Sequence, residues 1–383
     1  MKILMVAIPN HHFFQWVNQL KGAGYAVYWF DITDGGPKVE RIHWVYQIKG
    51  WKLRSDFPFR TSLKKKYPKL YHYINRYNER DTSKALRLQI QNINPDIIHC
   101  FEMVLTGLPV FNVLQKIKTP LIFSSWGSDM YNYKTFNVST TQAKAYLQRV
   151  DYLITDCKRD FEIAKSLNYN NTYLGVFPGN GGITINQMHI KPQNERHIIL
   201  VKGYNDGVGK AIEVLKALEM LTIDFYLNKE IVVYSADDVV VNYLKQSPFF
   251  SKLKTTCFSR YTFMDNNALL KIMGNSILHI GNSISDGMPN VLLEAMAMGA
   301  FPIQSNPGGV TAEIIEHAKN GFLIADPLSP KQISKHIKDA LLNAELRRSA
   351  QDYNVNFIKS NYNREHLKPK IVSLYNSILS SAK

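Results

Sequence analysis

Short apolar runs alternate along the chain with segments whose apolar residues recur at helical spacing. The first run, residues 2–8, leads into a helical segment from about Phe13 to Lys21, then two glycines and a second apolar run, residues 25–30. Continuous apolar runs are typical of strands that helices cover on both faces of a parallel sheet. The start of the chain therefore predicts a strand, a helix and a parallel strand.

The same alternation continues to about residue 155 and begins again near residue 197. Further strands are predicted at residues 96–99, 120–124, 152–155, 197–201, 230–234, 276–280 and 300–303. Strands that alternate with helices are typical of doubly wound domains. We therefore predict an α/β fold with two doubly wound, Rossmann-like domains.

Glycine, proline and polar residues interrupt the alternation between Phe177 and Arg196, which predicts the linker between the domains. The predicted N-terminal domain comprises residues 1–185 and the predicted C-terminal domain residues 196–360. Open α/β sheets bind ligands at the carboxyl ends of their strands. Two such domains therefore predict a ligand site in a cleft between them.

The composition agrees with two globular domains. A chain of 383 residues, 45% of them apolar and 20% charged, exceeds what one hydrophobic core usually organises and is not of disordered type. Its apolar runs are too short for a membrane span, and the first ends too early for a signal peptide, so we expect a cytoplasmic protein. Cys100, Cys157 and Cys257 are widely spaced, which favours buried thiols over disulfides or a zinc site.

The net charge of +15 is concentrated in part of the first half, where residues 49–87 hold 12 basic and 3 acidic side chains. This segment also holds the aromatic residues Trp51, Phe57, Phe59, Tyr67, Tyr71, Tyr73 and Tyr77. Such a mixture suits an anionic membrane surface, where aromatic rings lie at headgroup depth beside basic residues. The alternative is a solvated helix face whose aromatic residues pack inward. Nucleic acid is disfavoured, because no recognition module accompanies the charge.

Residues 281–299 carry the most informative chemistry. Asp286 precedes a short helix that Pro289 begins and Gly299 ends, and Glu294 lies within that helix among apolar residues and alanines. A carboxylate on such a buried helix needs a polar partner. Glu294 lies about 8 Å along the helix axis from Pro289, so the two acids can contact different parts of one extended ligand.

The start of the same helix is a candidate anion site. The backbone amides of Gly287, Met288 and Asn290 are expected to be free there and to bind an anion such as a diphosphate. The structural alternative is that Asp286 only caps the helix and Glu294 is a buried ion-pair partner.

Residues 285–303 resemble the donor site of retaining, GT-B fold glycosyltransferases of family 4. The resemblance continues through residues 306–310, 313–315 and 320–324. In that family two acids are separated by seven residues, as Asp286 and Glu294 are, although the first acid is usually Glu. The resemblance implies two Rossmann-like domains that face each other across a cleft, with a C-terminal helix, residues 366–383, packed on the N-terminal domain.

The resemblance also implies a nucleotide diphosphate sugar of UDP or GDP type as donor substrate, and no separate cofactor. Glu294 would accept hydrogen bonds from the ribose hydroxyls. Asp286 would orient the donor sugar together with the turn at Gly308 and Gly309. The donor-side residues include Gly287, Met288, Pro289 and Asn290 of the helix start.

A basic pair neutralises the donor diphosphate in this family. Lys210 matches the family's lysine, whereas Tyr204 stands at the usual arginine position and Lys202 is the candidate replacement. A lysine in a glycine-rich loop suits a diphosphate, because its charge is compact and the glycines permit close backbone approach. The alternative for Lys210 is an exposed surface lysine.

Residues 94–99 and 125–129 resemble the family's acceptor-side segments. The candidate acceptor-side residues are His12, which follows the first strand, and His99, Trp126, Gly127 and Ser128. Asp129 is the candidate general base if the reaction uses a protein group for this role. Isolated histidines are more often structural, which is the alternative for His12 and His99.

The chain contains no Asp-x-Asp triplet for a divalent metal, and the nearest match, residues 160–162, falls on a predicted helix. The resemblance thus implies a metal-independent, retaining hexosyltransferase. The basic, aromatic segment 49–87 suggests an acceptor at a membrane surface. We therefore expect a saccharide or lipid-linked saccharide acceptor in bacterial envelope polysaccharide or glycoconjugate synthesis, reached from the inner face of the cell membrane. The alternatives are another GT-B enzyme, such as a sugar-nucleotide epimerase or a phosphorylase, and a non-catalytic subunit that binds nucleotide or carbohydrate.

Overall fold

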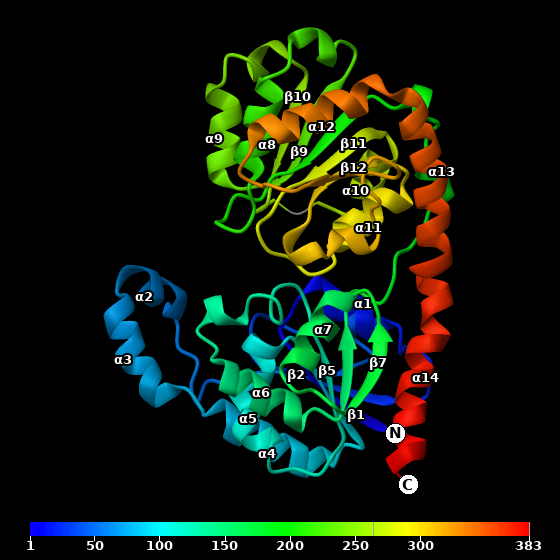
Figure 1. Cartoon of the computed structure of the whole chain (residues 1–383). Helices are drawn as coiled ribbons and strands as arrows, with labels where there is room; N and C mark the ends of the chain where they lie inside the picture. Colours follow the sequence, from blue (N-terminus) through cyan, green and yellow to red (C-terminus); the bar gives the residue numbers. More distant parts are fainter. Residues whose placement is uncertain (263, 383) are drawn as a thin grey trace. The chain divides into compact units, whose positions relative to one another are not determined.

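The computed structural model describes residues 1–262 and 264–382, which form two compact units (Figure 1). The first unit comprises residues 1–156, residues 160–181 and the end of the chain from residue 368. The second comprises residues 157–159 and 182–367. Each unit is built on one parallel sheet, so the predicted pair of doubly wound α/β domains is confirmed.

The sheet of the first unit has seven strands in the order β3-β2-β1-β4-β5-β6-β7. Its strands are β1 (Lys2–Ala7), β2 (Ala26–Asp31), β3 (Tyr46–Ile48), β4 (Ile97–Phe101), β5 (Leu121–Ser124), β6 (Tyr152–Thr155) and β7 (Thr172–Val176). The central strands β1 and β4 pair in register with Leu4 opposite Ile98. They are buried along almost their whole length, as expected of strands covered on both faces.

Helices lie between these strands, the last helix of the chain also packs on this unit, and several of these helices begin at recognisable capping signals. They are α1 (His11–Asn18), α2 (Arg60–Lys66), α3 (Pro68–Asn78), α4 (Thr82–Ile93), α5 (Phe111–Leu114), α6 (Thr140–Arg149), α7 (Lys158–Ser166) and α14 (Arg364–Ala382). The Asn10 side chain caps α1 by accepting from the Phe13 amide at 2.8 Å. Ser139 and Gln142 form a capping box at the start of α6.

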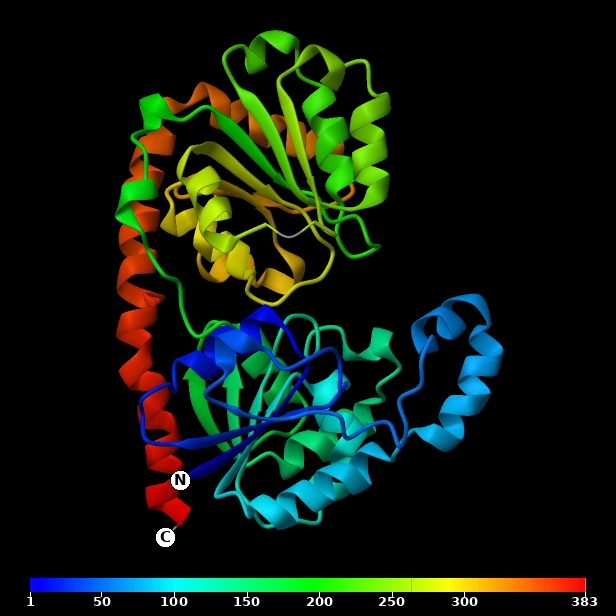
Figure 2. The ribbon, with the colours of Figure 1, turned by 180° about the vertical axis from the view of Figure 1, so that it is seen from behind.

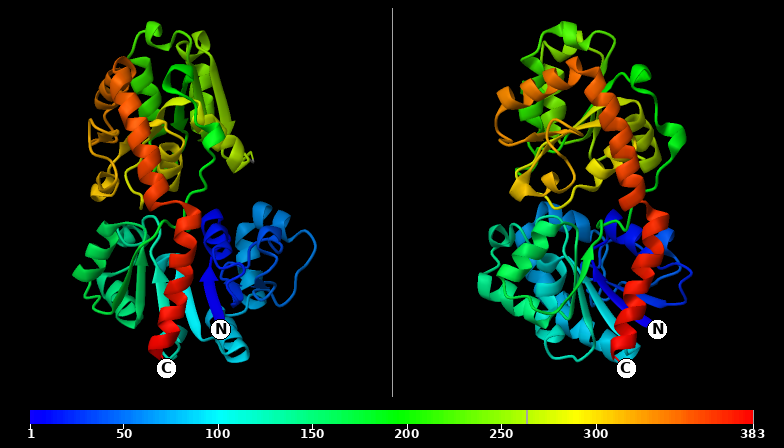
Figure 3. Two further views of the ribbon diagram at one scale, coloured as in Figure 1. Left: turned by 90° about the vertical axis from the view of Figure 1, so that its right-hand side faces the viewer. Right: turned by 45° about the vertical axis from the view of Figure 1, so that its right-hand side comes forward.

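Helix α14 packs on the sheet of the first unit from residue 368 onward (Figure 3). The Tyr375 hydroxyl accepts from Trp16 Nε1 at 3.1 Å and bonds to His99 Nδ1 at 2.8 Å. The Tyr25 hydroxyl donates to the Val372 carbonyl at 3.1 Å. These contacts tie the end of the chain to α1, β4 and the segment before β2.

The sheet of the second unit has six strands in the order β10-β9-β8-β11-β12-β13. Its strands are β8 (Ile198–Lys202), β9 (Glu230–Ala236), β10 (Thr255–Ser259), β11 (Ser276–Gly281), β12 (Phe301–Ser305) and β13 (Phe322–Ile324). Its helices are α8 (Ala211–Glu219), α9 (Asp238–Gln246), α10 (Asn266–Gly274), α11 (Asn290–Ala297), α12 (Pro330–Leu342) and α13 (Ala344–Asn361).

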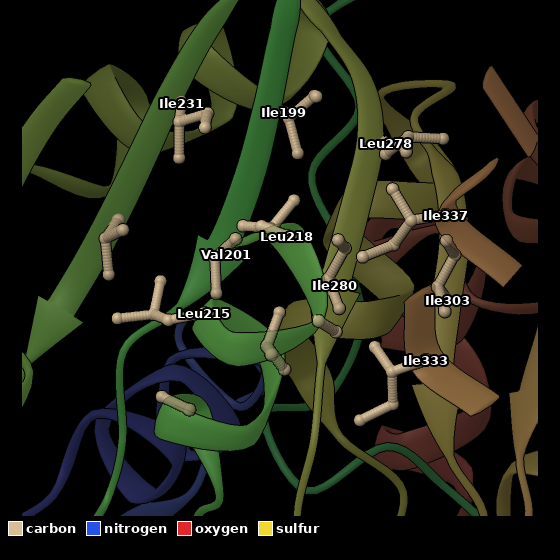
Figure 4. Packing of buried hydrophobic residues seen from close by; sticks show 14 of the residues in the cluster. Ile199, Val201, Leu215, Leu218, Ile231, Leu278, Ile280, Ile303, Ile333 and Ile337 are labelled. Atoms are coloured by element: carbon tan, nitrogen blue, oxygen red, sulfur yellow. The ribbon is translucent and has the colours of Figure 1, made fainter. Parts of the chain in front are cut away.

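Alternation along the strands divides the core of the second unit into two layers. Ile199 and Val201 of β8 face α8 and α12, whose residues Leu215, Leu218, Ile333 and Ile337 fill the layer drawn in Figure 4. Residue Leu200, between them in sequence, faces the opposite layer with α10 and α11. Figure 2 shows these helices on both faces of the sheet. Helix α11, which carries Glu294, is therefore held by a packed core.

Of the described helices, none combines the length and the apolar character needed to cross a bilayer.

Candidate functional site

The carboxyl ends of the six parallel strands meet along one edge of the second sheet. Lys202 ends β8, Arg260 follows β10, and Asp286 lies in the loop between β11 and α11. Gly308 and Gly309 form the turn after β12 and have left-handed φ values of 61° and 84°. The donor-side residues predicted from the sequence therefore lie along the edge where α/β sheets bind ligands.

Two loops at this edge are hydrogen-bonded to each other. The Lys210 amide donates to the Asn282 carbonyl at 2.9 Å, and Asn282 Nδ2 donates back to the Lys210 carbonyl at 3.2 Å. The Ile284 amide donates to the Val208 carbonyl at 3.0 Å. This ladder holds the half-buried Lys210 beside the loop that carries Asp286.

Asp286 is half-buried and lies near cationic groups. Burial raises the pKa of its carboxyl, while the Lys202 ammonium, the Gly287 amide and the Arg159 guanidinium oppose that rise. Arg159 Nη1 also donates to the carbonyl oxygens of Asp286 and Pro307, both at 2.9 Å. Arg159 thereby joins the Asp286 loop to the turn that contains Gly308.

The start of α11 differs from one of the alternatives. Its N-cap residue is Pro289, three positions after Asp286, so the alternative in which Asp286 caps this helix is wrong. The backbone amide of Gly287 lies near the Asp286 carboxyl and helps to lower its pKa against the effect of burial. The Met288 side chain packs in the apolar layer of α10 and α11, so its backbone, not its side chain, lies at the start of α11. Asn290 is the first residue of that helix.

Glu294 is 8% exposed and lies on α11 among residues that are buried from Leu292 to Ala297. Burial raises the pKa of its carboxyl to about 7, while a hydrogen bond from Asn266 and the charge of Arg364 oppose the rise. The polar partners that a buried carboxylate requires are therefore present. They come from α10 and from the start of α14.

Two cations lie close to the ring of Tyr204. Lys202 Nζ lies 4.7 Å from the centre of its ring, and Arg260 Cζ lies 4.3 Å from the same centre. Arg260 Nη1 also contacts the carboxylates of Asp237 at 2.8 Å and Asp206 at 3.3 Å. The sequence does not predict Arg260 as a site residue. A basic residue directly after a strand is the signal, but the strand before it, β10, has no continuous apolar run.

The acceptor-side candidates belong to the first unit. His12 lies in the first turn of α1, with its ring centre 6.3 Å from that of Trp126. The amide of Gly127 donates to an Asp156 carboxylate oxygen at 3.3 Å, and the Ser128 carbonyl accepts from the Asn132 amide at 2.8 Å. The loop after β5 thus places Trp126 beside His12 of α1 and Phe101 at the end of β4.

His99 is fully buried in β4, and burial holds the pKa of its imidazole well below the usual value. Its Nδ1 bonds to the Tyr375 hydroxyl and its Nε2 to the Ser124 hydroxyl, both at 2.8 Å. Both ring nitrogens are therefore used within the core. We assign His99 a structural role rather than contact with an acceptor.

Asp129 is buried, and its two oxygens accept from the amides of Met103 at 2.8 Å and Trp126 at 3.1 Å. Burial raises its carboxyl pKa well above the usual value, and the charges of Glu102 and Asp160 add to the rise. This geometry holds the loop that carries Trp126.

Glu102, which directly follows β4, is a site candidate that the sequence does not predict. It is half-buried, and its backbone has a φ of 73°. Burial raises the pKa of its carboxyl to about 7, against hydrogen bonds from the amides of Leu105, Val104 and Thr106. A lone acid at the end of an apolar strand is the signal in the sequence, and positive φ in a non-glycine residue is often found at functional sites.

Two family models match the chain and together cover more than half of it. The model of glycosyl transferases group 1 matches residues 255–357, and the model of glycosyl transferase 4-like proteins matches residues 2–157. The first match includes Asp286 and Glu294, and the second includes the loop with Trp126.

Solved structures share the fold over the whole chain. Sucrose-phosphate synthase from Thermosynechococcus elongatus matches with a TM-score of 0.73 at 16% identity, covering 100% of both chains. HepE from Anabaena in complex with UDP-glucose matches with a TM-score of 0.66 at 12% identity, covering 98% of this chain and 100% of HepE. The predicted GT-B fold is confirmed.

The fold and the family models together define a GT-B protein. The chain belongs to the glycosyltransferases of group 1. Among curated proteins, spore coat protein SA of Bacillus subtilis is 36% identical over 88 residues. That match spans 23% of this chain and 23% of the length of the relative.

Proposed function

We propose that this protein transfers a hexose from a UDP or GDP sugar to a hydroxyl of a saccharide or lipid-linked saccharide, with retention of anomeric configuration. The role would be in bacterial envelope polysaccharide or glycoconjugate synthesis. The observation that carries the proposal is the placement of Lys210, Asp286 and Glu294 along the carboxyl edge of one sheet. HepE, which shares the fold, was solved with UDP-glucose and with UDP.

The donor would be bound by residues of the second unit. The Glu294 carboxylate would accept hydrogen bonds from the ribose hydroxyls, and the Lys210 ammonium would bind the diphosphate. Asp286 and the turn at Gly308 and Gly309 would orient the sugar. Lys202 would supply the second cation in place of the family's arginine.

The transfer would proceed on one face of the sugar. The bond from the anomeric carbon to the diphosphate oxygen breaks, and its electron pair stays with the diphosphate. The acceptor hydroxyl oxygen bonds to the anomeric carbon from the same face, while its proton passes to a diphosphate oxygen. Cations and amides stabilise the leaving group, which is the main catalytic contribution. Asp129 would act as a positioning residue, since both its oxygens accept backbone amides.

Donor turnover distinguishes this proposal from its alternatives. We expect a thermal-shift screen to identify UDP or GDP and one nucleotide sugar as stabilising ligands. The stabilising sugar should then be transferred to a saccharide acceptor at an undiminished rate in EDTA, with the product anomer unchanged from the donor. Conversion of the nucleotide sugar to another nucleotide sugar in the absence of an acceptor would indicate an epimerase. Binding of the nucleotide sugar without any turnover would indicate a non-catalytic subunit. Loss of transfer activity in EDTA would contradict metal independence.

The loop that holds Lys210 depends on a glycine at position 209. A Cβ added to Gly209 would lie 2.4 Å from the Tyr204 carbonyl oxygen, which is backbone and has little freedom to move. We expect Gly209→Ala to displace the loop and to weaken nucleotide binding about tenfold, or about 1.4 kcal/mol. Calorimetric titration with UDP and GDP measures the change. Val208→Ala, at an exposed neighbour on the same loop, is the control, and equal affinities for both variants would contradict this role of the loop.

A further inference from the structure

Helices α2 and α3 form an excursion from the first unit with a narrow attachment. The Arg54 amide donates to the Asn78 carbonyl at 2.8 Å, and the Arg80 amide donates to the Lys52 carbonyl at 2.7 Å. An antiparallel bridge between Leu53 and Glu79 lies between these two bonds. The two helices stand away from the sheet of their unit in Figures 1 and 2. Residues 52–54 and 78–80 thus form a neck, and residues 55–77 extend beyond it.

Helix α3 leaves a row of large apolar side chains exposed. Leu70, Tyr73 and Tyr77 are spaced by three or four residues, so they share one face of the helix. Tyr67 directly precedes the helix, and each of the four side chains is between 51% and 64% exposed. None of the described residues of α3 is buried, and its half-buried residues lie on another face, at Tyr71, Ile74, Asn75 and Asn78. Of the seven predicted aromatic residues, four are exposed, so the alternative in which they pack inward is wrong for Phe59, Tyr67, Tyr73 and Tyr77.

Part of the predicted aromatic segment does not belong to this surface. Trp51 is buried and stacks on Phe30, with ring centres 4.8 Å apart. Phe59, directly before α2, is 82% exposed. The exposed aromatic surface is therefore confined to residues 59–77, which we call the α2–α3 surface.

The α2–α3 surface is basic as well as apolar. Residues 60–78 contain six basic side chains and no acidic one. Lys64, Lys65 and Lys66 are all exposed in the last turn of α2. Lys69 and Arg76 are exposed at a spacing of seven on α3, beside the row of tyrosines. The α2–α3 surface therefore offers cations directly next to aromatic rings.

We propose that the α2–α3 surface binds the face of an anionic lipid bilayer, with the tyrosine rings at headgroup depth and the lysines against the lipid phosphates. Tyrosine and lysine side chains suit this boundary, because each has an apolar body and a polar end. Basic residues close to the surface are attracted to anionic lipid. The exposed apolar row of α3 includes Leu70, whose aliphatic side chain can enter the lipid boundary but contributes little to nucleic-acid binding. This favours lipid over nucleic acid as the partner. The proposal goes beyond the transfer reaction and does not depend on it.

Sedimentation of the full-length protein with lipid vesicles tests the proposal. We expect the protein to sediment with vesicles of phosphatidylglycerol and phosphatidylcholine in equal parts, and not with phosphatidylcholine alone. Lys64→Glu, Lys65→Glu and Lys66→Glu together should weaken this binding at least tenfold, by reversing three charges at the surface. Tyr73→Ser with Tyr77→Ser should weaken it several-fold, because the aromatic contact is lost.

A matched charge change elsewhere is the control. Lys245, Lys252 and Lys271 are exposed lysines of the second unit, and their replacement by Glu alters the net charge by the same amount. This variant should bind vesicles almost as the unchanged protein does. Equal loss in both triple variants would show a general charge effect, and the proposal would be wrong.

Two further results would also overturn the proposal. One is failure of the unchanged protein to sediment with anionic vesicles. The other is tight binding of a single-stranded oligonucleotide that is lost in the Lys64, Lys65 and Lys66 variant, with no binding to vesicles. Because the assay uses no nucleotide sugar, neither result bears on the proposed transfer reaction, and nucleotide binding by the same variant should equal that of the unchanged protein.

Discussion

Replacement of Lys210 by alanine is expected to lower the turnover of sugar transfer by about 10²–10³-fold, the usual effect of removing one group that stabilises developing charge. Lys210 precedes α8, and hydrogen bonds between its backbone and Asn282 hold it beside the Asp286 loop. Its ammonium is proposed to stabilise the diphosphate as it leaves. The backbone bonds remain in the variant, so the fold should be retained. Steady-state rates with the identified donor and acceptor measure the effect.

Lys216→Ala provides the control for this variant. Lys216 lies on α8, the helix that follows Lys210; it is exposed, and its ammonium pairs with the Glu213 carboxylate at 2.9 Å. Its removal should leave turnover within about twofold of the unchanged protein, since exposed ion pairs contribute little. Normal turnover in Lys210→Ala, with the true donor, would contradict the proposed role of the lysine.

Replacement of Glu294 by glutamine is expected to weaken the binding of the nucleotide about tenfold to hundredfold, because charge-assisted hydrogen bonds to the ribose are lost. The neutral amide keeps the size of the side chain, so the packing of α11 should be retained. The exposed Glu316→Gln is the control and should bind nucleotide normally. Calorimetric titration distinguishes the two, and equal affinities would contradict the contact with ribose.

The raised pKa of Glu294 gives the unchanged protein a pH dependence that the Glu294→Gln variant lacks. The carboxyl has a pKa of about 7 in the folded protein, against an ordinary value of 4.5. Between these values the folded state binds the proton more tightly than the unfolded state does. The free energy of unfolding therefore falls as the pH rises through this window, in total by about 3 kcal/mol.

Glutamine does not ionise, so it removes this loss. We expect Glu294→Gln to melt at a higher temperature than the unchanged protein near pH 8 and at a similar temperature near pH 5. Nucleotide affinity of the unchanged protein should fall as the pH drops below about 7, because only the carboxylate accepts both ribose hydroxyls. The affinity of the variant should change little. Identical melting and binding profiles for both proteins would contradict the assignment.

The alternation of apolar runs and helical segments predicts the inner strands of both sheets, and it misses the strands at their edges. The four unpredicted strands are β3, β7, β10 and β13, and each lies at the edge of a sheet. Most residues of β3, β7 and β10 are only half-buried. An edge strand is covered less completely, so its sequence lacks the continuous apolar run that marks an inner strand.

The sequence predicts those residues of the candidate site that lie together in one short segment. Asp286 and Glu294 are eight positions apart, and their spacing is visible in the sequence. The partners of Glu294 are not, because Asn266 and Arg364 come from distant segments that only the fold brings together. Arg260 is missed for the same reason, since its place beside Tyr204 depends on the unpredicted strand β10.

Burial is the other property that residue type alone does not determine. His99 has the residue type of a binding group, but the structure uses both its nitrogens to hold Ser124 and Tyr375. In the opposite direction, Tyr73 and Tyr77 have the residue type of a core and are exposed. In each case the position of the segment in the fold, inside the sheet or on the protruding helices, decides whether the side chain is buried.

The central claim is that the second unit binds a nucleotide with its ribose at Glu294 and its diphosphate at Lys210. A crystal structure of the protein with UDP or GDP tests it most directly. We predict a ribose hydroxyl within hydrogen-bonding distance of the Glu294 carboxylate and a phosphate oxygen beside the Lys210 ammonium. A nucleotide bound elsewhere, or a Glu294 side chain that contacts only protein in the complex, would contradict the claim.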